Sequence, residues 1–312
     1  MKMKGPFRVG LLLTERCNIA CAHCWLGPTP NGGDMTLDEA KGYIDQASGI
    51  PTVEWISFTG GEPFLLPILL EELVSYASGK GLRTECVTNG SWAETPEKTE
   101  ENLKTLKEAG LDVVNISADD FHQEFVPFEN VQNCFEAAKG LGLKTVVMSA
   151  ARAGGFLRLT EIINRLGPDE IRTLGEEKST DGLSAIAVES GFIPVGRGTE
   201  LSREEWLIGT SPIDGPCRLV LRDLGINPDG ELLACCSAAS VLKLGRLGNV
   251  VEKDIGELLI EASSQPLFKI LAEYGPTRLG DSLGIQWRDG FISRCHLCHV
   301  VLKDPRIKVG LV

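Results

Sequence analysis

The amino-acid sequence predicts an α/β protein built on a parallel β-sheet. Six runs rich in apolar and β-branched residues recur between residues 8 and 189, and helical patterns lie between them. Strands that alternate with helices are typical of parallel sheets, because each helix carries the chain back across the sheet. The runs lack a polar face, so we expect both faces of the sheet to be covered. A doubly wound sheet and a barrel, complete or partial, both agree with this pattern.

The expected strands span residues 8–13, 53–58, 82–87, 112–117, 143–149 and 183–189. Several helices between them carry their own end signals. Thr36 and Glu39 form a capping box before one helix, and Pro96 opens another that ends at Gly110. The segment "FENVQNCFEAAKGLG" closes on glycine in the same way.

The rhythm of strands and helices changes after about residue 200. Residues 207–216 resemble a linker, and Asn227-Pro228-Asp229-Gly230 is a strong turn signal between two apolar runs, which predicts a β-hairpin. Helical patterns and the segment "RCHLC" follow. We therefore expect a first domain over 1–206, a linker over 207–216 and a small α+β domain over 217–312.

Composition and charge argue against several classes of partner. The chain has 312 residues and a net charge of -12 without a cluster of Lys and Arg, so a nucleic acid would be repelled overall. No apolar stretch approaches the roughly 20 residues of a membrane span. The short apolar run near the N-terminus is interrupted by Gly10 and followed by charged residues, which argues against a secretory signal. We expect a cytoplasmic protein.

The ten cysteines are distributed unevenly. Disulfide frameworks are rare in the cytoplasm, and grouped cysteines there indicate metal or cluster ligation. Cys86 lies in a strand-like run and Cys134 in a helix-like run, where a cysteine behaves as a small buried hydrophobe. Seven of the other eight cysteines form three tight groups, and Cys217 stands apart. The groups are Cys17/Cys21/Cys24, Cys235/Cys236 and Cys295/Cys298.

The first group, Cys17, Cys21 and Cys24, follows the first expected strand. A closed structural metal site normally has four ligands, so three thiolates leave one position open for chemistry. The spacing favours an iron–sulfur cluster, and a zinc loop with His23 as the fourth ligand is the alternative. The second strand ends in Gly60, Gly61 and Glu62.

Those three residues suggest a ligand site at the same edge of the sheet. The two glycines would let a ligand approach the backbone closely, and the carboxylate of Glu62 could bind an ammonium group. CxxxCxxC after the first strand and GGE after the second together resemble the radical S-adenosylmethionine superfamily. The resemblance covers about residues 8 to 200.

The resemblance implies a partial (β/α)6 TIM-type barrel with a 4Fe–4S cluster on the three cysteines. It also implies that S-adenosylmethionine binds the free iron and is reductively cleaved to a 5′-deoxyadenosyl radical, which abstracts a hydrogen atom from the substrate. Further cofactor contacts would come from the ends of later strands. The candidates, which could equally be solvated loop residues, are Asn89, Ser117, Ser149 and Arg152.

A second site is predicted from cysteines that lie far apart in the chain. Cys217, Cys235, Cys295 and Cys298 resemble the twitch domain, a shortened form of the SPASM extension, and the resemblance implies an auxiliary 4Fe–4S cluster. Structural zinc is the alternative. Simple hairpin register pairs Cys235 near Arg222, so the chain before Leu219 must curl back to bring Cys217 to the site.

Cys236 follows a predicted cluster ligand directly. Neighbouring residues of a strand point to opposite faces, so Cys236 should point away from the auxiliary site, in the direction of the barrel. The segments "ISFTGGE", "ISADDFHQEFV", "IPVG", "DGELLACCS" and "RCHLC" resemble the peptide epimerases that make epipeptides. That resemblance implies abstraction of a Cα hydrogen and return of hydrogen by Cys236 from the opposite face, which converts an L-residue to a D-residue.

Other functions remain open at this stage. The substrate is expected to be a peptide precursor or a small molecule, and an external electron donor such as a flavodoxin or ferredoxin is expected. A twitch-type dehydrogenase of a small alcohol would need no thiol donor, and another peptide maturase would form rings. A zinc- or cluster-binding scaffold is the non-enzymatic alternative. His122 in "DDFHQEF" could orient substrate or ligand, or be a structural histidine.

Overall fold

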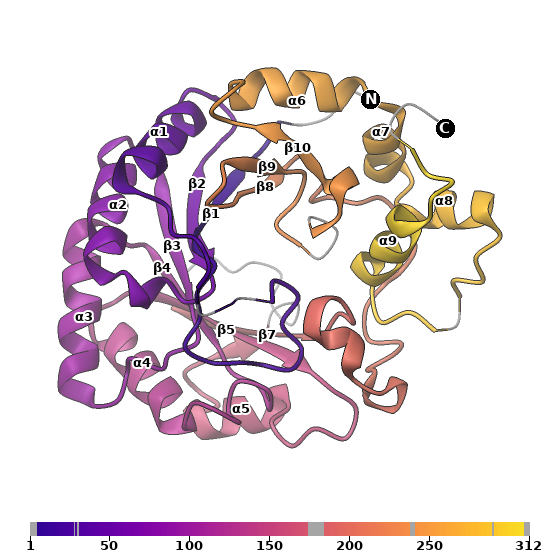
Figure 1. Ribbon diagram of the computed structural model, residues 1–312. Helices are drawn as coiled ribbons and strands as arrows, with labels where there is room; N and C mark the ends of the chain where they lie inside the picture. The colour runs from indigo at the N-terminus through magenta and orange to yellow at the C-terminus, as the bar shows by residue number, and fades with distance from the viewer. Residues whose placement is uncertain are drawn as a thin grey trace.

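The computed structural model describes residues 5–27, 29, 31–173, 184–237, 241–288 and 290–308. Within these residues the strands form one ten-stranded sheet with the order β10-β9-β8-β1-β2-β3-β4-β5-β7-β6. Its larger part is a partial barrel of parallel strands with helices on the outside, as Figure 1 shows. The expected partial (β/α)6 barrel is confirmed, and the doubly wound alternative is wrong.

The parallel strands are β1 (Arg8–Thr14), β2 (Trp55–Gly60), β3 (Arg83–Thr88), β4 (Val113–Ser117), β5 (Lys144–Ala151), β6 (Arg172–Thr173) and β7 (Ala185–Gly191). All six expected strands are present, with ends shifted by one or two residues; residue 183, the expected start of β7, lies outside the described residues. The two-residue strand β6 was not expected. It pairs with the outer edge of β7, where it is too short to leave a periodic pattern.

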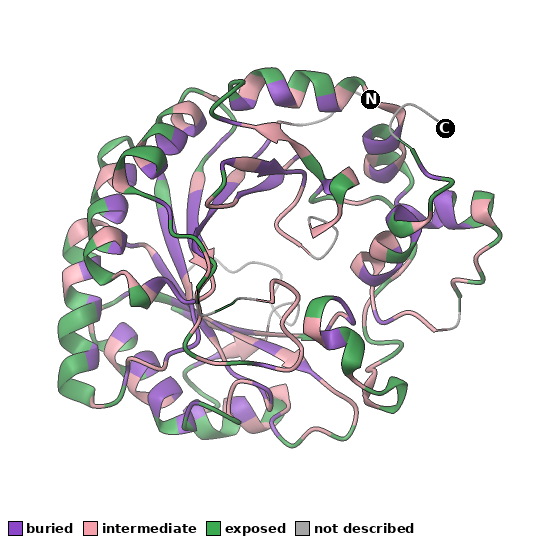
Figure 2. Cartoon of the chain, in the orientation of Figure 1, coloured by how far each residue is buried: buried purple, intermediate pink, exposed green. Residues whose placement is uncertain are grey.

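Five helices cover the outside of the barrel: α1 (Leu37–Ser48), α2 (Pro67–Gly79), α3 (Pro96–Ala109), α4 (Phe128–Gly140) and α5 (Leu159–Leu166). The predicted end signals act as expected. The capping box of Thr36 and Glu39 is formed, and Gly110 ends α3 in the left-handed conformation. Buried residues line the strands and the inner sides of these helices (Figure 2). Cys86 and Cys134 are fully buried in this core, as predicted.

The C-terminal part joins the same sheet. Strand β8 (Asp223–Ile226) pairs in parallel with β1, and the predicted turn connects it to β9 (Glu231–Leu233), which pairs with β10 (Arg246–Asn249). The remaining elements are α6 (Ile255–Ser264), α7 (Pro266–Glu273), α8 (Pro276–Leu283), α9 (Arg294–Lys303) and the short 3-10 helices η1 (Pro63–Leu65), η2 (Gly196–Glu200), η3 (Arg203–Glu205) and η5 (Lys243–Gly245).

The apolar core changes along the C-terminal part. The outer face of the β8–β9 hairpin packs into the barrel core through residues such as Leu224 and Leu232, whereas α7, α8 and α9 surround a second apolar cluster that includes Leu267 and Leu297. The division at 206 and 217 stays a prediction, since the sheet runs on across it. Among the described residues, no helix is both long and apolar enough to cross a membrane.

Candidate functional site

The loop with Cys17, Cys21 and Cys24 follows β1 at the carboxyl end of the barrel strands. Cys21 is buried, and the other two thiols are partly exposed. The backbone of Arg197 donates to Cys24 O over 3.1 Å, and its side-chain Nε donates to Cys21 O over 3.0 Å. Arg197 therefore holds the cysteine loop from a segment 170 residues further along. Our sequence reasoning missed it, although "IPVG" directly before it was a signal.

Gly60 and Gly61 allow close packing between the end of β2 and this loop. Gly60 has a φ of +126°, and a Cβ atom on Gly61 would lie 1.8 Å from Arg16 O. The amide of Gly61 donates to Thr14 O over 2.7 Å, so the two segments touch through their backbones. The sequence argument assigned the glycines to the approach of a ligand. The structure shows a second reason for glycine at position 61, which is the close approach of the chain that carries Cys17, and the ligand contact stays a prediction.

Glu62 is 1 % exposed, and its carboxylate already has three protein donors. Oε1 accepts from Thr88 Oγ1 over 2.8 Å and from Phe64 N over 3.1 Å, and Oε2 accepts from Asn89 N over 2.8 Å. Burial raises the pKa of Glu62 to about 7 against the effect of these donors. Glu62 therefore positions the end of β3, and its bond to a ligand ammonium group stays a prediction.

Replacing Glu62 by alanine should therefore destabilise the fold. The change leaves the buried Thr88 hydroxyl and Asn89 amide without an acceptor, and each such group costs about 1–3 kcal/mol. We expect the free energy of unfolding, measured anaerobically with urea, to fall by about 3 kcal/mol. Glu62→Gln retains one acceptor oxygen and should lose less. Equal losses for the two variants would contradict the positioning role.

Asn89 is brought to the predicted cluster ligand. Its side-chain Nδ2 lies 3.7 Å from Cys17 Sγ and donates to Asn18 Oδ1 over 3.0 Å. The GGE motif, the end of β3 and the cysteine loop thus meet at one place, as their position at the strand ends predicts. Polar amide groups beside Cys17 could hold a polar cofactor if the three cysteines bind a cluster.

The other candidate cofactor contacts fall in different places. Ser117 pairs with Met148 in the sheet and shares the inner face of β4 with Asn115. Ser149 lies two residues after Val147 on β5, and side chains two residues apart point to the same face of a strand. Val147 belongs to the core between the strands and the outer helices, so Ser149 also points outward and does not reach the cysteine loop. Its buried hydroxyl has no hydrogen-bond partner.

Arg152 at the end of β5 is engaged with acidic side chains. The nearest carboxylate oxygen, that of Glu205, lies 3.3 Å from a guanidinium nitrogen of Arg152. Carboxylate oxygens of Asp120 and Glu124 lie within 4 Å of the same guanidinium group. Its guanidinium also lies 5.0 Å from the centre of the Phe121 ring. These contacts hold Arg152 behind the ring that faces the cysteine loop, and none of them reaches a cysteine.

His122 lies beside the cysteine loop. Its Nδ1 is 2.9 Å from both carboxylate oxygens of Asp119, and the rings of His122 and His23 are 5.1 Å apart. Burial opposes charge on the ring, but Asp119 and Cys21 together raise the pKa of His122 to about 10. Burial lowers the pKa of His23 to about 4. The ligand atoms of Cys21, His23 and His122 lie within 4.8 Å of one another.

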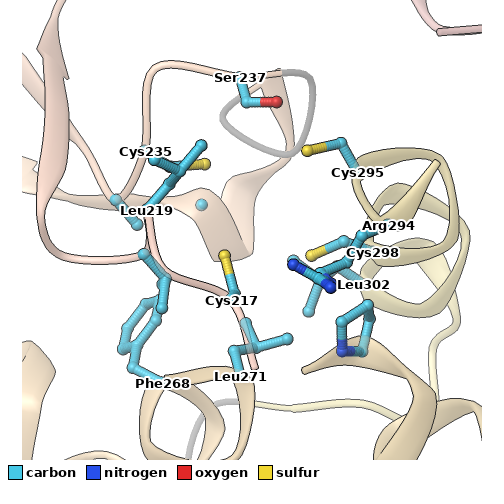
Figure 3. A pocket seen from close by; sticks show the side chains of 14 residues that line it. Cys217, Leu219, Cys235, Ser237, Phe268, Leu271, Arg294, Cys295, Cys298 and Leu302 are labelled. Atoms are coloured by element: carbon cyan, nitrogen blue, oxygen red, sulfur yellow. The ribbon is translucent and has the colours of Figure 1, made fainter. Parts of the chain in front are cut away.

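The four cysteines of the predicted second site line one pocket. Cys217 and Cys235 come from the two sides of the hairpin, and Cys295 and Cys298 come from α9. Figure 3 shows all four sulfur atoms pointing into the space between them. Four converging thiols from a buried pocket are a donor set that fits a 4Fe–4S cluster or zinc. The structure thus brings the four predicted ligands together from positions up to 81 residues apart.

A tight turn before β8 explains how Cys217 reaches the same pocket as Cys235, although simple hairpin register pairs Cys235 near Arg222. Arg222 N and Asp223 N both donate to Leu219 O over 2.9 Å, and Leu221 has a φ of +55°. The amide of Leu221 pairs with Ala234 O. The chain therefore turns back immediately before the hairpin, and Cys217 reaches the pocket. A left-handed leucine gives no sequence signal, because this conformation is normally left to Gly or Asn.

Cys236 points away from this pocket and into the barrel, as predicted. Strand β9 ends at Leu233, so bends over 234–237 rather than strict alternation separate the two neighbouring thiols. A Cβ atom on Gly10 of β1 would lie 3.4 Å from Cys236 Sγ. Gly10 shares the inner face of β1 with Arg8, which pairs with Asp223 and Glu85. Cys236 therefore lies against β1 in the interior of the barrel.

Burial raises the pKa of Cys236 to about 12, with Asp223 as a further cause. The thiol therefore keeps its proton at neutral pH. An S–H bond is present and directed into the barrel, on the other side of the hairpin from the four-cysteine pocket. These two properties are the ones that a hydrogen-atom donor needs.

A partial parallel barrel with a three-cysteine loop at the end of β1 and GGE at the end of β2 defines a radical S-adenosylmethionine (SAM) domain. Residues 11–151 match the Radical SAM superfamily, so this part of the chain is a radical SAM domain. A 4Fe–4S cluster and SAM are the cofactors of this superfamily. Cys17, Cys21 and Cys24 fit the cluster, because they offer three thiols from one loop, one fewer than a closed four-ligand site, and Asn89 lies beside one of them.

Similar proteins have several activities. YydG of Bacillus subtilis, named for peptide biosynthesis, is 27 % identical over 132 residues, which are 42 % of this chain and 41 % of YydG. The AdoMet-dependent heme synthase of Methanosarcina barkeri is 30 % identical over 201 residues, 63 % of this chain and 53 % of that protein. The chain spans about half the length of the curated relatives it matches.

A solved structure supports the fold over nearly the whole chain. BtrN in complex with AdoMet and 2-DOIA superimposes with a TM-score of 0.56 at 15 % identity, covering 92 % of this chain and 98 % of BtrN. At this level of identity the likeness concerns the fold alone. It extends beyond the matched superfamily region and includes the C-terminal part.

Proposed function

We propose that this chain is a radical SAM enzyme that epimerises a residue of a ribosomally made peptide, with Cys236 as the hydrogen donor. The observation that carries this proposal is the position of Cys236. Its thiol keeps its proton and lies in the barrel interior against Gly10, while its neighbour Cys235 faces the four-cysteine pocket. A thiol in the barrel would have little purpose in a dehydrogenase, whose product does not take up hydrogen.

The cofactors, when bound, supply a 5′-deoxyadenosyl radical that removes the Cα hydrogen of one residue. The protein then has to deliver hydrogen to the opposite face of a planar centre. Cys236 is held by the hydrogen bond from its own amide to Asp223 O, 2.7 Å long, so its sulfur has a defined place. A donor fixed on one side of the substrate sets the configuration of the product.

The four-cysteine pocket suits the same reaction. Donation of hydrogen leaves a sulfur radical on Cys236, which needs one electron and one proton to become a thiol again. We propose that Cys217, Cys235, Cys295 and Cys298 hold an auxiliary 4Fe–4S cluster that supplies this electron, since Cys235 is the direct neighbour of Cys236. The original reductant would be an external flavodoxin or ferredoxin.

A peptide substrate is supported by the relative YydG, which is named for peptide biosynthesis. The heme synthase among the relatives keeps other substrates open, and the resemblance of "DGELLACCS" and "RCHLC" to epipeptide epimerases favours the peptide. The substrate would enter the barrel from its carboxyl end, where the cysteine loop lies.

Incubation in deuterated buffer tests the reaction type. The reconstituted protein, SAM and dithionite are mixed anaerobically with candidate precursors, chosen from short peptides encoded beside the gene. Epimerisation predicts a mass increase of one deuterium at a single Cα and a D-residue in the hydrolysate. A loss of two hydrogens would show dehydrogenation or ring formation and would overturn the epimerase proposal, as would SAM cleavage without any change in the peptides.

A further inference from the structure

The side chain of His122 connects a buried carboxylate with the cysteine loop. Nδ1 of the ring lies 2.9 Å from both oxygens of Asp119, which makes Nδ1 a proton donor to that carboxylate. The second ring nitrogen is left for another partner. Cys21 is a neighbour of the ring, because one ring nitrogen of His122 and Cys21 Sγ lie within 4.8 Å of each other.

Asp119 is held rigidly behind the ring. It is 1 % exposed, and its carboxylate accepts backbone hydrogen bonds from Phe121 and His122, both 3.0 Å long, and from Ala150 on β5, 3.1 Å long. A carboxylate fixed by strand β5 and by the loop after β4 cannot follow the ring if the ring moves. A ring that donates to Asp119 from one nitrogen can donate from the other only when both nitrogens carry hydrogen.

The surroundings of Cys21 restrict the ring further. His23 stacks on Phe121 with ring centres 4.6 Å apart, and Phe121 meets Phe192 edge to face. Cys21, Phe121 and Phe192 form a small apolar cluster of their own. In such surroundings a hydrogen bond to sulfur is not weakened by water.

We propose that His122, held by Asp119, donates an N–H···S hydrogen bond to the Cys21 thiolate of the radical SAM cluster and raises the reduction potential of that cluster. His122 would be a positioning residue that acts through Cys21. Hydrogen bonds to cluster sulfurs raise the potential, because they stabilise the additional negative charge of the reduced state. A carboxylate–histidine pair behind a metal ligand is also a common way to orient that ligand.

This inference rests on a cluster at Cys17, Cys21 and Cys24, but not on the peptide chemistry. It concerns the entry of one electron from an external reductant into the cluster, before any substrate reacts. A protein that cleaves SAM without acting on peptides would still have to show the effect. Failure of the epimerase proposal therefore leaves this inference standing, and the reverse also holds.

The test is an anaerobic redox titration of the reconstituted full-length protein, followed by EPR. The radical SAM cluster is identified as the signal that changes when SAM is added. In His122→Phe, which retains a ring but has no donor, we expect the ratio of reduced to oxidised cluster at a fixed potential to fall about tenfold. This equals a shift of about 59 mV toward more negative potential for a one-electron couple.

Two further variants separate this effect from a folding defect. Asp119→Asn keeps the histidine but removes the charge behind it, so its potential should shift in the same direction. Glu124→Gln changes a half-exposed residue of the same loop and should keep the wild-type potential. Iron content of about eight per chain confirms that each variant is loaded with two clusters.

The outcome decides between two uses of the same residues. An unchanged potential in loaded His122→Phe overturns the proposal. A second result would also overturn it. The wild-type protein, given Zn²⁺ alone, would bind one ion, and His122→Phe and His23→Asn would each fail to bind it. Both variants would at the same time keep the wild-type reduction potential of the cluster. Cys21, His23 and His122 would then form a zinc site. A more negative potential in both His122→Phe and Asp119→Asn supports the hydrogen bond.

Discussion

Replacing Cys236 by alanine is expected to abolish formation of the D-residue while cleavage of SAM continues. The thiol lies in the barrel interior against β1, apart from the cysteine loop that would hold the radical SAM cluster. Its removal therefore leaves the step that generates the radical in place. The substrate radical then has no donor on its far face and reacts with solvent or reductant instead. Quantifying 5′-deoxyadenosine and the D-residue in the same sample measures radical formation and epimerisation together. The ratio of 5′-deoxyadenosine to D-residue should rise at least tenfold in the variant.

Two other substitutions serve as controls for Cys236→Ala. Cys236→Ser keeps the size of the side chain, but its O–H bond is too strong to give up hydrogen, so it should behave like the alanine variant. Cys134→Ala removes a fully buried thiol that lies on α4, outside the barrel interior, and should keep full epimerisation. Normal yields of D-residue from Cys236→Ala would remove this residue from the mechanism.

Replacing Gly61 by alanine is expected to prevent assembly of the radical SAM site. The new Cβ would lie 1.8 Å from Arg16 O and 3.1 Å from Cys17 N, and these are backbone atoms, which cannot rotate away as a side chain does. The end of β2 and the cysteine loop must then separate. We expect loss of about half of the iron, no SAM cleavage and a fall of about 3 kcal/mol or more in the free energy of unfolding.

A glycine elsewhere provides the control for Gly61→Ala. Gly42 lies within helix α1, and a Cβ atom there has open space around it. Alanine is the better helix former by about 1 kcal/mol, so Gly42→Ala should stabilise the protein slightly and keep its iron. If Gly61→Ala kept its full iron content and still cleaved SAM, the close contact between GGE and the cysteine loop would not be required for assembly of the site.

Much of the radical SAM site could be predicted from local patterns. CxxxCxxC and GGE each occupy a few neighbouring residues at the ends of consecutive strands, so their spacing alone brings them to one edge of the sheet. The roles within the motif were harder to predict. The contacts of Glu62 with Thr88 and Asn89 depend on the end of β3, 26 and 27 residues away, and no spacing rule covers that distance.

The residues around the site that sequence reasoning missed share a cause. Arg197 donates to a backbone oxygen of the cysteine loop from 176 positions away. Asp119, about 100 positions away, contacts His122, whose side chain lies beside that loop. Ser149 was expected at the site because it ends a strand. One position of register places it on the outer face instead, since successive side chains of a strand alternate.

Local patterns were sufficient to predict a parallel α/β sheet and the hairpin, and the resemblance of two motifs to a known family implied the barrel and the ligand roles of seven cysteines. Capping boxes, apolar runs, turn residues and tight cysteine groups are local patterns, and their consequences do not depend on the rest of the molecule. Folding alone decided that Leu221 adopts a left-handed turn that returns Cys217 to the pocket, and that Cys236 lies against Gly10. The contact between Cys236 and Gly10 joins segments more than two hundred residues apart, and the turn at Leu221 is held by Leu219 O and Ala234 O. Contacts of this kind leave no periodic trace in the sequence of either segment.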